Sequence, residues 1–306
     1  MPRSRKLKRL LNYEARKLNE IARVEKLPEF LLLLPLVQDP PSTVPSVLEA
    51  HAALTSSTIA DAKKETVASR SDLLGTHPYN TWLALLVLVG QTPPTKQSKI
   101  VEFILELQKI EVVDKDTNPS EVLKYSDEDM EYYWKDMPGF GMEVRGIFNL
   151  ELTFYQDLYS PFTTDEQKTA YENQNAFLAQ LLAKVKINTV PEEWEMFDYS
   201  VHALWVLCEA FENEGGKNKD SVIRSACWWL VFAAEKLWFN VVICRGRPDD
   251  TGVGWDFGEN KDWVGYNRER WEFWKECLRN ANGDGQTSIL IKDALACMER
   301  ATGTES

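Results

Sequence analysis

SACWWLVFAAEKLWF, residues 225–239, is the stretch that decides the fold. It lies within a longer apolar run, residues 221–244, which is long enough to cross a lipid bilayer. However, the run contains Arg224, Glu235 and Lys236, and each charge costs about 2.5–3.5 kcal/mol near the centre of a membrane. This cost outweighs the gain from a helix with several Ala, Cys and Trp positions. We therefore expect a buried central helix near 220–244, in a protein without a membrane span.

Apolar residues recur with a period close to 3.6 along almost the whole chain, which is typical of helices. Strictly alternating strand patterns are nearly absent. The sequence therefore predicts an all-α fold: a single compact multi-helix domain of about ten or more helices around the central helix. The expected helices cover residues 4–26, 46–71, 79–90, 96–111, 126–136, 140–158, 164–187, 191–213, 220–244, 267–281 and 287–301.

The charge of the chain is unevenly distributed. The formal net charge is −12, but residues 1–26 carry +6, so the rest of the chain carries −18. An acidic body makes nucleic acid an improbable partner, because phosphate backbones attract basic surfaces. We expect residues 1–27 to form a basic helix, an appendage to a single domain over 28–306. This helix is compatible with nuclear localisation, a membrane surface, nucleic acid or docking on its own chain.

Five scattered cysteines argue against both metal binding and a disulfide framework. Their number is odd, no CxxC pair occurs, and each lies in an apolar helical context. We therefore expect no metal and no cofactor, and a reducing compartment, which means the cytoplasm or, given the basic N-terminus, the nucleus. The cysteines are Cys208, Cys227, Cys244, Cys277 and Cys297.

One segment imitates a calcium-binding loop. In NANGDGQTSILI, residues 280–291, Asn280, Asn282 and Asp284 occupy the first, third and fifth positions, and Gly285 the sixth. The twelfth position holds Ile291, where a glutamate should close the coordination shell. The segment is therefore interpreted as a helix-capping turn.

His202 is the first candidate for a functional side chain. Asp198 precedes it by four residues, a spacing that lets a carboxylate orient the imidazole of a general base. An ordinary contact on a half-exposed helix rim has the same spacing, and no nucleophile pattern lies nearby.

The central helix offers a second set of candidates. Arg224, Trp228 and Glu235 share one stripe, but Arg224 and Glu235 are about 16 Å apart along the helix and cannot pair with each other. If both are buried, each needs a partner from elsewhere, and Arg245, Arg247 and Arg270 are the candidates for Glu235. A ligand pocket with aromatic walls and structural ion pairs are both compatible with this pattern.

The last third of the chain resembles a known family. The order is an alanine- and tryptophan-rich helix (SACWWLVFAAEKLW), a loop with Gly and Arg (RGRPDDTGVGW), and RERWEFWKECL. It is similar to a large family of fungal cytosolic proteins, the domain of unknown function 3632. In that family an Arg-Trp-x-x-Trp-Lys block closes the domain, as Arg270, Trp271, Trp274 and Lys275 would here. The likeness is good over residues 198–278 and vague before Thr81. It implies a helical fold and supplies neither an activity nor functional residues.

Two functions of different classes follow from these observations. The first, which we favour, is a non-enzymatic helical scaffold or protein-interaction protein. The second is a small-molecule-binding protein or an enzyme with an interhelical pocket lined by His202, Arg224, Trp228, Glu235 and Arg270. The partner, a protein or a small-molecule ligand, and the oligomeric state stay open, and so does the question of whether the chain is an enzyme.

Overall fold

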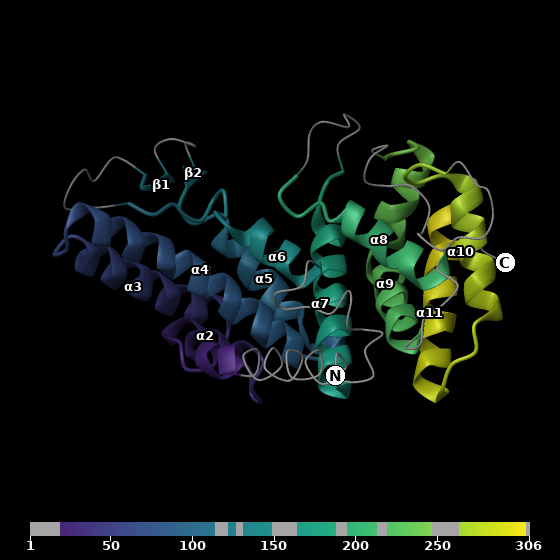
Figure 1. The fold of residues 1–306 in the computed structure, drawn as a ribbon, viewed down its shortest axis with the longest axis horizontal. Helices are drawn as coiled ribbons and strands as arrows, with labels where there is room; N and C mark the ends of the chain where they lie inside the picture. Colours follow the sequence, from purple (N-terminus) through teal and green to yellow (C-terminus); the bar gives the residue numbers. More distant parts are fainter. Residues whose placement is uncertain are drawn as a thin grey trace, which may run out of the picture. The chain divides into compact units, whose positions relative to one another are not determined.

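Helices make up nearly all of the regular structure in the computed structural model, which describes residues 19–113, 122–126, 131–148, 164–187, 195–212, 219–246 and 263–303 (Figure 1). The expectation of an all-α fold with about ten or more helices is confirmed. The described α-helices are α2 (Pro28–Leu33), α3 (Val44–Ala62), α4 (Val67–Gln91), α5 (Ser98–Leu107), α6 (Phe140–Phe148), α7 (Asp165–Lys184), α8 (Ser200–Phe211), α9 (Lys219–Val242), α10 (Arg268–Asn280) and α11 (Gly285–Thr302). Short 3₁₀ turns, η1 (Leu34–Leu36) and η2 (Pro94–Lys96), and two strands, β1 (Lys124–Ser126) and β2 (Glu131–Tyr132), complete the elements.

The chain divides into two compact units, residues Met1–Phe154 (unit 1) and Tyr155–Ser306 (unit 2). The expected organisation, a basic helix at 1–27 followed by one domain over 28–306, stays a prediction. In the described part of the chain, no helix is long and apolar enough to cross a membrane.

Helix α9 is the centre of unit 2, as the sequence predicts for residues 220–244. It lies between α7 and α11 and also packs on α8 (Figure 1). Its inner face places Leu230, Ala233 and Leu237 in the core, all 2% exposed or less. Arg224 of α9 contacts Glu172 of α7 and Thr287 of α11, and further along the same helices Trp229 contacts Asn175 and Val231 contacts Cys297, so α7, α9 and α11 run in the same direction. Helices α8 and α10 run antiparallel to α9 and contact each other.

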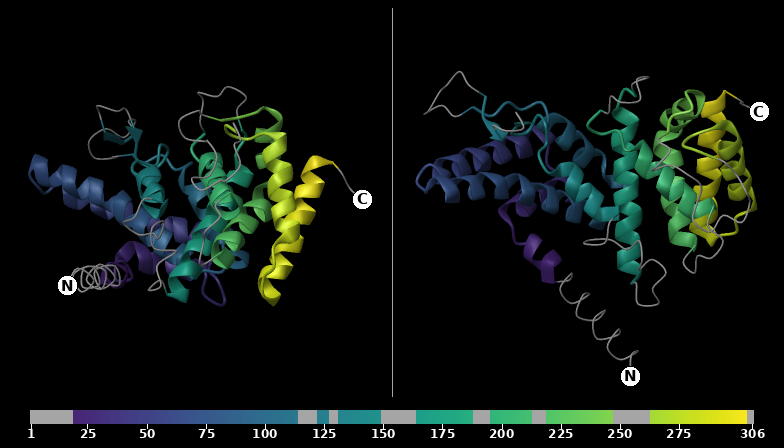
Figure 2. Two further views of the ribbon diagram at one scale, coloured as in Figure 1. Left: turned by 45° about the vertical axis from the view of Figure 1, so that its right-hand side comes forward. Right: turned by 45° about the horizontal axis from the view of Figure 1, so that its top comes forward.

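In unit 1, α3 and α4 form an antiparallel pair, against which α2 and α5 pack (Figures 1 and 2). Strands β1 and β2 form an antiparallel hairpin, with Lys124 opposite Tyr132. The expected helix at 126–136 is therefore wrong. Tyr133 and Trp134, directly after β2, are each 1% exposed, and this burial overrides the local helical pattern. The Asp136 carboxylate accepts the Tyr132 N–H (2.6 Å), and Met137 adopts a left-handed φ of 48°.

Helix α4 continues through a proline, Pro78. The expected helices at 46–71 and 79–90 are in fact α3 and α4, separated by a short turn at 63–66, and Pro78 lies inside α4. A proline has no N–H for the carbonyl four residues earlier, which here is that of Leu74. The Tyr133 hydroxyl donates to this carbonyl (2.9 Å) and so replaces the missing helical hydrogen bond.

Helix ends follow the capping signals only in part. Thr164 and Gln167 form a complete capping box at the start of α7. Asp284 caps α11 by accepting the Thr287 N–H (3.0 Å), so the calcium-like segment is indeed a capping turn. Asp220 is of a residue type that favours the N-cap position, but it lies in the first turn of α9.

Candidate functional site

Arg270 and Glu212 form a fully buried ion pair in unit 2, with both side chains 0% exposed. The guanidinium binds the carboxylate through two nitrogens (2.6 and 2.8 Å), and the Trp274 indole N–H donates to the same carboxylate (2.8 Å). Arg270 also donates to the Gly265 carbonyl (2.8 Å) and to the Cys208 sulfur (2.8 Å). Because each charge has several partners, the desolvation cost of both is offset and the arrangement is rigid.

The surroundings of this pair keep Cys208 chemically inert. Burial raises the pKa of the Cys208 thiol well above its usual value, although the Arg270 charge acts in the opposite direction. The thiol is therefore neutral at physiological pH, and a neutral thiol is neither a nucleophile nor a metal ligand. In the described part of the chain, no group of three or more His, Cys, Asp or Glu side chains is placed to hold a metal ion.

A second buried pair joins Arg245, just after α9, to Asp198, just before α8 (2.6 Å). Asp198 also accepts the Ser200 N–H (3.1 Å) and the Ser200 hydroxyl, so it fixes the start of α8. The Tyr266 hydroxyl donates to the Ser200 carbonyl (2.6 Å). The Asp198 carboxylate thus accepts hydrogen bonds from Ser200 at the start of α8 and from Arg245. The His202 ring lies edge-on to the rings of Tyr199 and Trp205.

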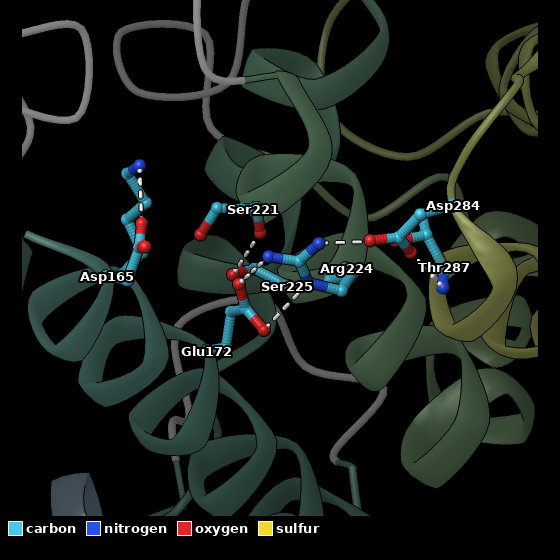
Figure 3. A network of polar contacts seen from close by, with 8 residues as sticks. Asp165, Glu172, Ser221, Arg224, Ser225, Asp284 and Thr287 are labelled. Atoms are coloured by element: carbon cyan, nitrogen blue, oxygen red, sulfur yellow. Dashed lines mark hydrogen bonds and ion pairs between the residues drawn. The ribbon is translucent and has the colours of Figure 1, made fainter.

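Arg224 connects the N-terminal halves of three helices, α7, α9 and α11 (Figure 3). Its guanidinium binds Glu172 of α7 through two nitrogens (3.0 and 2.7 Å) and donates to the Thr287 hydroxyl of α11 (3.1 Å). Thr287 in turn donates its hydroxyl proton to Asp284 (2.8 Å). The Glu172 contacts raise the pKa of Arg224, so the charge is permanent and the network locks α7, α9 and α11 together.

The outer face of α9 carries a line of large side chains that we call the α9 stripe: Trp228, Phe232, Glu235, Phe239 and Val242. Their spacing of four, three, four and three residues is that of one continuous helical face. The Trp228 and Phe232 rings stack on each other, with centroids 5.5 Å apart. Trp228 and Phe232 are half-buried, whereas Phe239 is 38% exposed and Val242 51% exposed, so the C-terminal end of the stripe faces solvent.

The five side chains expected to line one pocket lie in different environments. Arg270 is in the core with Glu212, Arg224 is in the N-terminal half of α9 and binds Glu172, and His202 lies against Tyr199 and Trp205. Trp228 and Glu235 belong to the α9 stripe.

Glu235 is exposed and therefore needs no buried partner. The candidate partners Arg245 and Arg270 bind Asp198 and Glu212 instead, and Arg247 lies outside the described residues. The ligand pocket itself stays a prediction.

Residues 82–278 match a protein family whose description is "protein of unknown function (DUF3632)". The match covers well over half of the chain. The chain belongs to the DUF3632 family. No curated protein and no solved structure matches it. The resemblance inferred from the Arg-Trp-x-x-Trp-Lys block is thus confirmed.

The structure gives this block of the DUF3632 family a physical role. Arg270 and Trp274 hold Glu212, Trp271 packs against Trp238 of α9 (5.5 Å between ring centroids), and Lys275 reaches Glu299 of α11 (3.7 Å). The four residues therefore join α10 to three other elements. Their role is to hold the core together.

A second polar cluster lies in unit 1, entirely before the residues of the DUF3632 match, and the sequence pattern did not reveal it. The histidine cluster consists of Glu29, His51, Thr55, His77 and Thr81, all 5% exposed or less. Glu29 Oε1 lies 2.8 Å from His77 Nδ1, and Thr55 Oγ1 lies 3.1 Å from His77 Nε2. Thr81 Oγ1 lies 3.4 Å from His51 Nε2, and the two imidazoles stack 5.4 Å apart.

The hydroxyl protons of the two threonines fix the protonation of both histidines. Each hydroxyl donates to a helical carbonyl: Thr55 to that of His51 (3.0 Å) and Thr81 to that of His77 (2.9 Å). A hydroxyl has a single proton, so both threonines accept from the Nε2–H of the facing imidazole. His51 is then neutral, with Nδ1 as a buried acceptor that has no hydrogen-bond partner. One proton lies between His77 Nδ1 and Glu29.

The cluster resembles a nucleophile–base–acid relay only in its distances. A glutamate, a histidine and a threonine lie in hydrogen-bond order, as in hydrolytic sites. However, Thr55 is 2% exposed and its proton is held by a helical carbonyl, so it is not presented to a substrate. The signal in the sequence was the spacing His51–Thr55 and His77–Thr81, four residues on each of two adjacent helices.

Proposed function

We propose that the protein is a non-enzymatic helical interaction protein that binds an amphipathic helix of a partner on the α9 stripe. The observation that carries the proposal is the stripe itself: four apolar residues that, with Glu235 between them, follow alternating four- and three-residue steps on one face of α9. An amphipathic partner helix anchors through residues with this spacing. The two buried arginine pairs of unit 2 and the half-buried Arg224 network support the proposal, because they keep the stripe in a fixed position.

Isolated exposed apolar residues are normal on any protein surface, so exposure alone has little weight. Met142 and Ile289, for example, are 69% and 61% exposed on other helices. What distinguishes Phe239 and Val242 is that they continue the line of Trp228 and Phe232 on the same helix face. A partner helix could therefore bury all four side chains at once.

The charges favour a basic partner. Glu235 lies in the middle of the stripe, is exposed, and forms no ion pair within the described part of the chain. Residues 27–306 as a whole carry −18. A second copy of this chain, placed antiparallel, would bring two Glu235 carboxylates together. A Lys or Arg opposite Glu235, between apolar anchors, fits better.

We propose that this interaction takes place in the cytoplasm, where the free cysteines of the described part stay reduced.

The proposal is tested with two synthetic 18-residue helices that share one apolar face with four- and three-residue spacing. One carries Lys and the other Glu beside this face. We expect the full-length protein to bind the Lys peptide more tightly in fluorescence anisotropy. Phe239→Ser should weaken binding about tenfold or more, because burying a side chain of this size contributes about 1.5–3 kcal/mol.

The matched control is Ile289→Ser, which removes an exposed apolar side chain from α11 and not from the stripe. It should leave the affinity unchanged. Glu235→Lys should reverse the preference in favour of the Glu peptide. Binding of the Lys peptide that survives Phe239→Ser would show that the stripe is not the docking surface. A dimer of the free protein that Phe239→Ser dissociates would assign the stripe to a second copy instead.

A further inference from the structure

The histidine cluster joins the elements of unit 1 at one point. Glu29 comes from α2, His51 and Thr55 from α3, and His77 and Thr81 from α4. Trp134, after the β1–β2 hairpin, packs on both imidazoles, with ring centroids 4.9 Å from His51 and 5.5 Å from His77. Phe103 of α5 contacts His51 edge-on (5.7 Å). Any change of charge in the cluster therefore affects the packing of five segments.

We propose that the histidine cluster is a proton-operated latch, in which a proton added at His51 Nδ1 releases α2 and the Tyr133–Trp134 segment from the α3–α4 pair. In the closed state the cluster holds one proton between Glu29 and His77, and its net charge is zero. The second proton makes the closed cluster a buried cation. This second proton triggers opening, because the closed cluster contains no further carboxylate that could neutralise the added charge.

The groups around the two imidazoles show why the added charge is not compensated. Helix α2 contributes Glu29, whose charge is matched by the shared proton. The segment after β2 contributes the Tyr133 hydroxyl, which donates to Leu74 and whose pKa is raised by burial and by Tyr125 and Glu29. Helix α5 contributes only the Phe103 ring. A second imidazolium would thus stack on His77 at 5.4 Å without a counter-charge.

The direction of the pH effect follows from linkage. Burial, and to a lesser extent the His77 charge, lowers the pKa of His51 to about 3 in the closed state. In the open state His51 meets water and has an ordinary pKa of about 6.5. Opening therefore takes up one proton between these values, and the closed state is fully favoured above about pH 6.5. Between about pH 6 and pH 4 the opening equilibrium constant should rise about tenfold for each unit of falling pH.

The histidines themselves provide the first test, because the chain contains only His51, His77 and His202. Histidine-labelled full-length protein should give three imidazole signals in NMR spectra. We expect the His51 signal to show an Nε2–H tautomer that does not titrate in the closed state between pH 7 and pH 5. A His51 signal that titrates near pH 6.5 without opening would overturn the proposal.

The second test is native-state amide hydrogen exchange of the full-length protein, corrected for the intrinsic pH dependence of exchange. Opening of α2 and of the segment around Trp134 should increase about tenfold per pH unit from pH 6 to pH 5. His51→Gln should make this opening nearly independent of pH in the same range. His202→Gln, which removes a histidine of unit 2, should leave it unchanged.

The amides of α9 and α10 serve as an internal reference. Exchange in these helices that follows that of α2 at every pH would mean that the whole protein unfolds, and would contradict a local latch. An equal pH dependence in the wild type and in His51→Gln would show that another group takes up the proton. If His51→Gln does not fold, the NMR titration of the wild type still decides between the outcomes.

Discussion

Buried charges in unit 2 are held by partners that lie far away in the sequence. Arg270 and Glu212 are 58 residues apart, and Arg245 and Asp198 are 47 residues apart. The carboxylate of Glu212 accepts from Arg270 and from Trp274 in a site with no exposed side-chain surface. Removal of one partner therefore leaves the other as an uncompensated charge in the core.

We expect Glu212→Ala to lower the free energy of unfolding by about 3–5 kcal/mol, because Arg270 then remains buried without its counter-charge. The double variant Glu212→Leu/Arg270→Met should be more stable than Glu212→Ala, since it buries no charge. Urea denaturation measures both. As a control, Asp61→Asn removes an exposed pair with Lys64 on α3 and should change stability by less than about 0.5 kcal/mol. A double variant no better than the single one would refute this explanation.

These residue pairs also show which parts of the site could be predicted from the sequence. Sequence reasoning identified Arg224 and Glu235 as charges in need of partners, because both lie within an apolar helical pattern, and it named Arg270 only as a candidate partner of Glu235. It could not identify Glu172 or Glu212, because a pairing across 50 or more residues depends on how helices pack. It missed the histidine cluster for the same reason. Each histidine looks ordinary on its own helix, and only the antiparallel packing of α3 on α4 brings the rings together.

At the level of elements, α4 depends on a side chain from another segment. Pro78 leaves the Leu74 carbonyl without its helical donor, and the Tyr133 hydroxyl takes over this role. The expected helices, 46–71 and 79–90, left residues 72–78 outside any helix, and a proline inside a helix is unfavourable unless another donor replaces its missing N–H. The compensating donor, 59 residues away, is not visible in the local sequence.

Tyr133→Phe should therefore cost about 1–3 kcal/mol of stability, because it leaves the part-buried Leu74 carbonyl without a donor. In a Pro78→Ala background the backbone N–H of residue 78 can donate to Leu74, and the same substitution should cost clearly less. A double-mutant cycle in urea measures this coupling. Equal costs in the two backgrounds would show that the Tyr133 hydroxyl does not replace the helical bond.

The start of α7 is an element end that the sequence did predict. Gln167 N–H donates to the Thr164 hydroxyl (3.3 Å), and Thr164 N–H donates to the Gln167 side chain (2.8 Å). Thr164→Ala should lower the free energy of unfolding by about 1 kcal/mol, whereas Thr164→Ser, which keeps the cap, should be nearly neutral. A thermal unfolding series measures the difference. Equal stability of the two variants would mean that α7 does not depend on its cap.

At the scale of the whole molecule, the sequence was most informative where a pattern repeats many times. The 3.6-residue period gave the all-α class and the central helix, because each extra turn adds independent support. It failed at residues 126–136, where a few aromatic side chains decide between a helix and a hairpin. The DUF3632 family is described as being of unknown function, so membership in it identifies no reaction and no ligand. The proposed function therefore rests on the surface and the charge of this chain.

The net charge of −12 leads to a prediction that concerns the molecule as a whole. If the α9 stripe receives a basic helix, the negative field of the protein should accelerate the encounter, and salt should screen this long-range part first. The association rate of the Lys peptide should therefore fall severalfold between about 20 and 200 mM salt. The dissociation rate should change little, because it reflects the apolar contacts of Trp228, Phe232, Phe239 and Val242.

Stopped-flow fluorescence with full-length protein separates the two rates. Phe239→Ser should accelerate dissociation and leave the salt dependence of association intact, whereas Glu235→Gln should reduce association only slightly, since it removes one charge of many. An association rate that does not respond to salt would mean that the acidic body plays no part in choosing the partner. The choice would then depend on the apolar stripe alone, and a neutral helix should bind as well as a basic one.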